Sequence, residues 1–183
     1  MHLNKDVSIA ALILLLTLPI LATFSILIIL EDGLPILYRS ERIGKSGKSF
    51  TLYKFRSMKK QTPLVESQKL SNPESFLLRT GAIMRKLSID EIPNLVNVLK
   101  GEMHIIGYRP AIKSQLFLNS QRELNGITEY SPGITGLAQV RKRDFITDRE
   151  KICYEKFYIK KRNWKLNFKI ILETFFSIKL VSH

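Results

Sequence analysis

The sequence predicts a mostly α-helical fold with a few short β-strands, made of a membrane-inserted helix and a compact cytoplasmic domain. Residues 7–30 of the 183-residue chain carry no charge, and about 20 apolar residues suffice to cross a bilayer as a helix. Several later segments repeat apolar residues at helical spacing, and the last of them is basic and amphipathic. We therefore divide the chain into a membrane segment, residues 1–31, and a cytoplasmic domain, residues 32–183.

The membrane segment has a proline, Pro19, at its middle. Proline removes a backbone donor and bends a helix, so the segment is either a kinked spanning helix or a re-entrant helix whose ends share one face. The charged residues Lys5 and Asp6 precede it, and a basic cluster follows from Arg39. We expect the re-entrant form, with the domain in the cytoplasm by the positive-inside rule. The apolar run is too long for a signal peptide, and a buried core helix would need a larger protein around it.

The rest of the chain alternates short periodic segments with turn-rich ones. Glycines between residues 44 and 47 separate two predicted strands. The predicted strands are 36–38 and 50–55; the helices are 76–87, 93–99, 115–124, 151–158 and 164–180; the loops are 62–73 and 131–136. The final helix could expose an aromatic face to a membrane interface or pack it in the core. That face comprises Trp164, Phe168, Ile171, Leu172, Phe175 and Phe176.

The net charge of +13 indicates phosphate-bearing partners: nucleic acid, an anionic membrane face or phosphorylated substrates. A single cysteine excludes an internal disulfide and fits a reducing compartment. The three histidines are scattered, so the sequence predicts no His/Cys metal cluster.

Two adjacent acids, Asp90 and Glu91, form the strongest local pattern. Ser88 and Glu91 match a capping box, but Pro93 would then lie inside the helix and forfeit a backbone bond. We therefore expect the helix to begin near residue 92 or 93, with both carboxylates at its positive end. Such carboxylates can bind a cation or attack an electrophile.

Basic residues and rigid turns surround the acidic pair in the sequence. Arg79, Arg85 and Lys86 precede it, and the turns Gly-Tyr-Arg-Pro (107–110) and Pro-Gly-Ile-Thr-Gly (132–136) follow, before basic residues 141–143. Arginine binds phosphate through two nitrogens, and glycine lets the backbone approach it. The combination predicts a site for phosphorylated substrates.

Four stretches together resemble a known family. They are YKFRSM (53–58), TGAIMRKLSIDEIPNLVNVLKGEM (80–103), GYRP (107–110) and SPGITGLAQV (131–140). In this order and approximate spacing they resemble the bacterial sugar transferases, also called monotopic phosphoglycosyl transferases. The resemblance covers most of the chain, which is similar to small single-domain members such as those that transfer diacetylbacillosamine 1-phosphate.

The resemblance implies a catalytic domain on the cytoplasmic face of the inner membrane. It implies a UDP-sugar donor, undecaprenyl phosphate as acceptor, Mg²⁺ as cofactor and UMP as released product, in the first membrane step of bacterial glycan assembly. Asp90 would be the covalent nucleophile and a magnesium ligand, and Glu91 would assist as acid or base. The other matches would bind substrate: Lys54, Arg85, Arg109 and Arg143.

Three positions depart from the family pattern. The usual Pro-Arg-Pro reads Tyr108-Arg109-Pro110, the usual Ser-Pro in the apolar helix reads Leu18-Pro19, and an aspartate is replaced by Glu155. Two other functions fit parts of the sequence: a non-catalytic membrane-anchored adaptor of the same fold, and a membrane-tethered nucleic-acid binder suggested by charge alone. Because the acidic pair and Arg109 are all retained and no nucleic-acid motif is found, we expect the transferase and no nucleic-acid partner.

Overall fold

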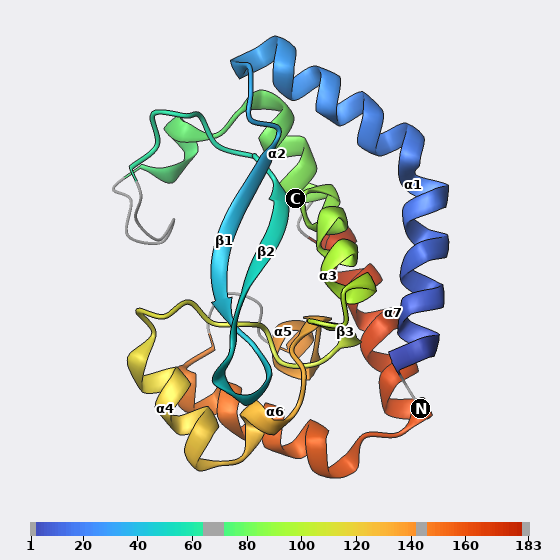
Figure 1. Ribbon diagram of the computed structural model, residues 1–183, viewed down its shortest axis with the longest axis vertical. Helices are drawn as coiled ribbons and strands as arrows, with labels where there is room; N and C mark the ends of the chain where they lie inside the picture. Colours follow the sequence, from blue (N-terminus) through green and yellow to red (C-terminus); the bar gives the residue numbers. More distant parts are fainter. Residues whose placement is uncertain (1–2, 64–71, 142–145, 181–183) are drawn as a thin grey trace.

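A computed structural model describes residues 3–63, 72–141 and 146–180, and helices predominate in them, as predicted (Figure 1). The α-helices are α1 (Leu3–Asp32), α2 (Arg79–Lys86), α3 (Leu95–Leu99), α4 (Leu116–Leu124), α5 (Leu137–Arg141), α6 (Asp148–Lys161) and α7 (Trp164–Leu180). The 3-10 helices are η1 (Lys45–Gly47), η3 (Pro73–Phe76), η4 (Ile89–Asn94) and η5 (Ile127–Glu129). The strands are β1 (Leu37–Ile43), β2 (Ser49–Phe55), β3 (His104–Ile106) and β4 (Gly133–Thr135).

Helix α1 is one continuous helix with Pro19 inside it, and its ribbon bends along its length (Figure 1). It is long and apolar enough to cross a membrane. Thr17 and Thr23 flank the proline, and their hydroxyls donate to the carbonyls of Ile13 at 2.7 Å and Pro19 at 2.9 Å. The proline has no N–H for the carbonyl of Leu15 one turn earlier, and the two hydroxyls bond to other carbonyls of the helix.

One side of α1 packs along the rest of the protein (Figure 1). Near its start, Ala10 is fully buried against Leu52 and Val98; near its end, Ile28 is fully buried against Phe55. The opposite side is apolar and exposed, and it includes Leu12, Leu15, Leu16, Leu18 and Ile20. An exposed apolar face of this length suits lipid rather than water.

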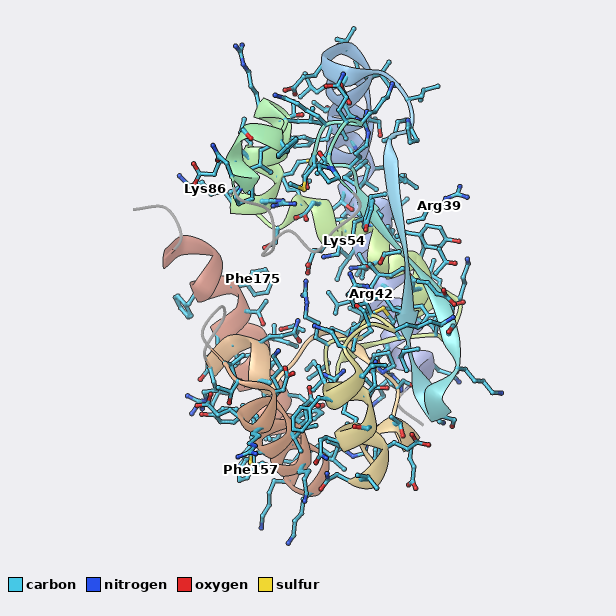
Figure 2. All side chains as sticks on the ribbon, turned by 90° about the vertical axis from the view of Figure 1, so that its left-hand side faces the viewer. Arg39, Arg42, Lys54, Lys86, Phe157 and Phe175 are labelled. Carbon is cyan, nitrogen blue, oxygen red and sulfur yellow. The ribbon has the colours of Figure 1, made fainter. Side chains whose placement is uncertain are left out.

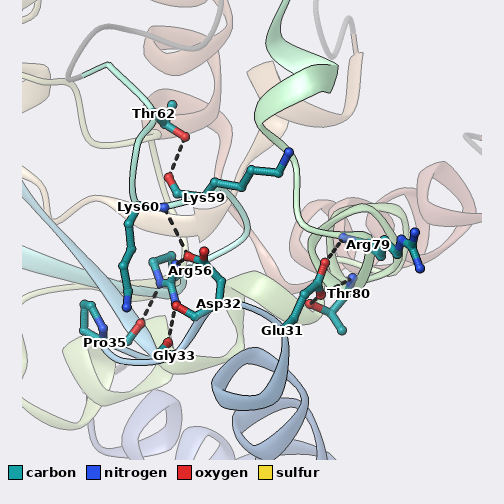
Figure 3. A network of polar contacts seen from close by, with 10 residues as sticks. All are labelled: Glu31, Asp32, Gly33, Pro35, Arg56, Lys59, Lys60, Thr62, Arg79 and Thr80. Atoms are coloured by element: carbon teal, nitrogen blue, oxygen red, sulfur yellow. Dashed lines mark hydrogen bonds and ion pairs between the residues drawn. The ribbon is translucent and has the colours of Figure 1, made fainter.

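Both ends of α1 are fastened by charge to that same body. At the start, Asp6 pairs with His104 at 2.5 Å. At the end, Asp32 pairs with Arg56, and Glu31 accepts hydrogen bonds from the backbone N–H groups of α2 residues Arg79 (2.5 Å) and Thr80 (3.0 Å) (Figure 3). Both ends of the apolar helix are therefore attached to the same part of the protein.

Strands β1 and β2 form an antiparallel hairpin running from Leu37 opposite Phe55 to Ile43 opposite Ser49. The first predicted strand, 36–38, was too short, because pairing with β2 extends it to Ile43. Helix α3 lies between this hairpin and α1, while α4 and α6 lie near the hairpin's turn (Figure 1).

The predicted loop at 131–136 was wrong, because Gly133–Thr135 is a strand that pairs in parallel with His104–Ile106. The glycines that suggested a loop, Gly133 and Gly136, instead allow close packing of the backbone. A Cβ at Gly133 would lie 2.0 Å from the backbone nitrogen of Gly107, and one at Gly136 would lie 1.9 Å from its carbonyl oxygen. The Gly-Tyr-Arg-Pro and Pro-Gly-Ile-Thr-Gly turns therefore pack backbone against backbone.

Two predicted helices begin three residues away from their predicted starts. The helix expected at 76–87 is α2, which begins at Arg79 after η3. The helix expected at 151–158 is α6, which begins at Asp148 because Thr147 and Glu150 form a capping box. Most of the loop predicted at 62–73 lies outside the described residues.

Helix α7 coincides with the predicted range, and most of its aromatic face is exposed. Trp164 is 74% exposed and Phe175 is 66% exposed, whereas Ile170 on another face is fully buried. Phe168, Leu172 and Phe176 are also exposed. The aromatic face is therefore not packed in the core, and this favours the interfacial interpretation of the helix.

Candidate active site

The acidic pair lies in a tight turn between α2 and α3. Ser88 has a left-handed backbone (φ 55°) and makes no side-chain cap, and η4 begins directly after it. The capping box is thus absent, as expected, but the predicted helix start near residue 92 was wrong. The chain turns sharply at Ser88 and enters a 3-10 turn that already contains Asp90 and Glu91.

Glu91 is held between two cations from separate elements. Its Oε1 accepts hydrogen bonds from Nζ of Lys54 on β2 at 2.5 Å and from Nη2 of Arg109 at 3.2 Å. Burial alone would raise the pKa of Glu91, but the charges of Arg109 and Lys54 outweigh it and lower the pKa to about 2. Glu91 is therefore an anion at any physiological pH.

Asp90 has the opposite electrostatic setting. Burial raises its pKa above the ordinary 3.8, and the neighbouring charge of Glu91 raises it further. Lys54 and Arg85 act against these effects and lower the pKa of Asp90. The adjacent acids thus differ: one is fixed as an ion by salt bridges, and the other is a less compensated carboxylate.

The cations are positioned by contacts that the sequence did not reveal. Nε of Arg85 donates to the Ser57 hydroxyl at 2.9 Å. Asn97 of α3 is fully buried; its Oδ1 accepts from the backbone N–H of Tyr53 at 3.3 Å, and its Nδ2 donates to the Thr51 carbonyl at 2.7 Å. Asn97 therefore ties the strand that carries Lys54 to the helix that follows the acidic pair.

A small pocket lies between the acidic pair and its cations, and two of the residues that line it were not assigned to the site by sequence analysis. Arg42 of β1 and Asn94 of η4 line it together with Lys54, Glu91 and Arg109. Arg42 belongs to the basic cluster after Arg39, which was used only to predict membrane topology. Its Nη1 donates to the Pro110 carbonyl at 3.4 Å. Figure 2 shows Arg42 and Lys54 toward the middle of the molecule.

Asn94 is buried, yet its Oδ1 has no hydrogen-bond partner among the described residues. A buried acceptor without a partner is unfavourable unless a ligand or water satisfies it. Its position three residues after Glu91 was the available signal, since residues three apart share a face of a 3-10 helix.

The structure therefore gathers five of the predicted site residues around one centre: Asp90, Glu91, Lys54, Arg85 and Arg109. The sixth, Arg143, lies outside the described residues. The assembled groups can hold a phosphate by charge and present a carboxylate to it.

Taken together, a helix-rich fold, a long apolar helix and a carboxylate pair enclosed by cations define a class of protein suited to phosphorylated substrates at a membrane. The family model described as "Bacterial sugar transferase" matches residues 2–180. The chain belongs to the bacterial sugar transferase family, so the resemblance found in its motifs is confirmed.

Several curated relatives share the match. The chain is 37% identical to "Uncharacterized sugar transferase EpsL" of Bacillus subtilis, over 90% of this chain and 81% of the relative. It is 34% identical to "Undecaprenyl-phosphate galactose phosphotransferase" of Salmonella typhimurium, over 74% of this chain and 31% of the relative. It is 33% identical to "UDP-N-acetylgalactosamine-undecaprenyl-phosphate N-acetylgalactosaminephosphotransferase" of Aeromonas hydrophila, over 93% of this chain and 42% of the relative.

Proposed function

We propose that the protein transfers a sugar 1-phosphate from a UDP-sugar to undecaprenyl phosphate and releases UMP. The observation that carries the proposal is the Asp90–Glu91 pair, placed beside Lys54, Arg85 and Arg109. The relatives whose names specify undecaprenyl phosphate and a sugar donor support the same reaction.

The reaction is a double displacement. The Asp90 carboxylate attacks the β-phosphorus of the UDP-sugar; a carboxylate–phosphorus bond forms, and UMP leaves with the electrons of the broken P–O bond. A phosphate oxygen of undecaprenyl phosphate then attacks the phosphosugar on Asp90 and restores the carboxylate. Lys54 and Arg109 stabilise charge on the phosphate oxygens in both steps.

Magnesium fits the donor set of this site. Mg²⁺ is bound by one or two carboxylates together with substrate phosphates and water, and Asp90 is the carboxylate not committed to a salt bridge in the described residues. When bound, the ion would neutralise negative charge on the diphosphate. Asp90 would hold it, while Glu91 keeps Lys54 and Arg109 in place.

The membrane geometry supports the lipid acceptor. Helix α1 has an exposed apolar side, and both of its ends are tied to the same body. We infer a re-entrant helix in the cytoplasmic leaflet of the inner membrane, with the aromatic face of α7 at the interface. We propose accordingly that residues 1–31 form the membrane segment and residues 32–183 the catalytic domain.

Purified protein in vesicles containing undecaprenyl phosphate tests the function directly. A panel of UDP-sugars is supplied, and UMP release and lipid-linked sugar are measured with Mg²⁺ and with excess EDTA. We expect release with at least one donor and its loss in EDTA. No release with any donor would contradict the proposal and favour the non-catalytic adaptor, and full activity in EDTA would remove magnesium from it.

A further inference from the structure

The proposed phosphate-binding side chain, that of Arg109, is exposed although the neighbouring residues of its turn are buried. It is 51% exposed, and it forms an ion pair with Glu91 at 3.2 Å. The family pattern has a proline before this arginine, whereas this chain has Tyr108. The backbone of the turn is held on one side, because the N–H of Gly133 donates to the carbonyl of Tyr108 at 2.9 Å, and the Tyr108 side chain adds a second attachment.

Tyr108 supplies a contact with the interior of the protein. It is 5% exposed and packs in a buried cluster with Ala111, Leu118, Ile127 and Ile152. The neighbouring side chain of Arg109 is exposed. The buried tyrosine therefore holds the backbone that joins the two residues. The position of Arg109 therefore depends on how firmly the tyrosine ring is held.

The guanidinium of Arg122 holds that ring. The Cζ atom of Arg122 lies 4.7 Å from the centroid of the Tyr108 ring. Cation–π contacts are strongest where both partners are removed from water, and the Arg122 side chain is only 2% exposed.

Glu155 in turn fixes the arginine. Its carboxylate accepts two hydrogen bonds, from Nε of Arg122 at 2.9 Å and from Nη2 at 2.6 Å, which is the paired geometry that orients a guanidinium most strictly. The Glu155 side chain is 4% exposed. Arg122 belongs to α4 and Glu155 to α6, so two helices outside the acidic site converge under the turn.

We propose that Tyr108, Arg122 and Glu155 are positioning residues that hold Arg109 against Glu91. Two of the three departures from the family pattern, Tyr108 and Glu155, thus form one network. Buried ion pairs are often no more stable than apolar residues of the same size, which is consistent with a role in orientation. This inference rests on the proposed function of Arg109.

The network itself indicates which variants are informative. The Tyr108 hydroxyl is buried without a hydrogen-bond partner in the described residues. The contact with Arg122 is therefore made by the aromatic ring, and Tyr108→Phe should preserve the network. Tyr108→Leu removes the ring but keeps an apolar filling. The paired change Arg122→Met/Glu155→Leu removes the cation without leaving a lone buried charge. An exposed ion pair outside the network, Glu41→Gln/Lys113→Gln, is the matched control.

The test measures kcat and KM for a UDP-sugar that the wild-type protein uses, together with the melting temperature of each variant. A displaced Arg109 should raise KM and lower kcat/KM about tenfold to a hundredfold in Tyr108→Leu and in the paired variant. A loss of folded protein would lower kcat alone. Tyr108→Phe and the Glu41/Lys113 control should remain within about twofold of wild type, the scale of change expected when no interaction with the network is lost.

The same changes are then made in an Arg109→Lys background. If the network acts through Arg109, these changes should cause no further loss of kcat/KM in the Arg109→Lys protein. Losses of kcat/KM that add fully in the combined variant would overturn the proposal. A wild-type KM in a natively folded Tyr108→Leu protein would also overturn it. Hydrogen exchange of residues 107–112 gives a readout that needs no activity. Exchange should accelerate at least tenfold in the paired variant, and unchanged exchange refutes the network even if no donor is turned over.

Discussion

At the scale of single residues, the two neighbouring acids show how position divides their roles. Glu91 accepts from Lys54 and Arg109, which lowers its pKa to about 2, whereas burial and the charge of Glu91 raise the pKa of Asp90. A carboxylate already shared by two cations is a weak nucleophile, because its lone pairs are engaged. Asp90 is therefore the acid that we propose as the nucleophile.

Asp90→Asn should abolish turnover while leaving the fold intact, because the amide has nearly the same shape but cannot form the acyl phosphate. Wild-type protein given a UDP-sugar without lipid acceptor should gain the mass of a phosphosugar on Asp90, detected by peptide mass spectrometry. The control Asp148→Asn, on the surface of α6, should retain activity. Substantial turnover by Asp90→Asn would exclude this residue as nucleophile.

The raised pKa of Asp90 also predicts the acid side of the pH profile. A nucleophilic carboxylate must be ionised, so kcat/KM should fall as pH decreases through a pKa above 3.8. Glu91, with a pKa of about 2, stays ionised over that range and adds no second step. Rates measured between pH 4 and 8 on protein whose folding is checked at each pH would show this limb; a flat profile down to pH 4 would contradict it.

At the scale of elements, the buried pair between α4 and α6 predicts an asymmetry in stability. Arg122→Met alone leaves the Glu155 carboxyl in the interior without its partner, which costs about 3–5 kcal/mol. The paired change Arg122→Met/Glu155→Leu should recover most of that loss. Denaturant unfolding measures both, with the exposed Glu41–Lys113 pair as control at about 0–1 kcal/mol. Equal destabilisation by the single and paired variants would be inconsistent with this account.

The elements also show what sequence patterns can predict. Helix α7 and all of α4 were predicted because their apolar spacing is regular, and α1 because its residues 7–30 are uncharged. Strand β4 was missed because Gly133 and the adjacent Gly136, a turn signal in sequence, serve close backbone packing with Gly107.

Sequence patterns likewise predicted only those residues of the site that belong to local motifs. Asp90, Glu91 and Arg109 were found through local motifs, whereas Arg42 and Asn97 act through contacts with distant segments. The pairing of Arg122 with Glu155 spans 33 positions and follows no local pattern. Only the folded chain shows that these side chains meet.

At the scale of the whole molecule, the exposed apolar side of α1 and the aromatic face of α7 are the surfaces suited to lipid. The proposed re-entrant topology places both ends of α1 in the cytoplasm. A single cysteine at Asn4, which is exposed, with Cys153 replaced by serine, tests it by labelling of intact cells. We expect no reaction with an impermeant periplasmic reagent, and reaction after the cells are permeabilised. Labelling in intact cells would show that the helix spans.

The attachment of α1 at both ends also bears on the order of synthesis and folding. Asp6 lies 98 positions before its partner His104, so more than half of the protein is translated before that contact can form. Until the segments that contain Leu52, Phe55 and Val98 have been synthesised, the apolar helix has no protein surface to cover its inner side, and exposed apolar segments in nascent chains aggregate. Entry of α1 into the bilayer during translation would precede completion of the acidic site, and the membrane would thereby act as the first folding partner of this chain.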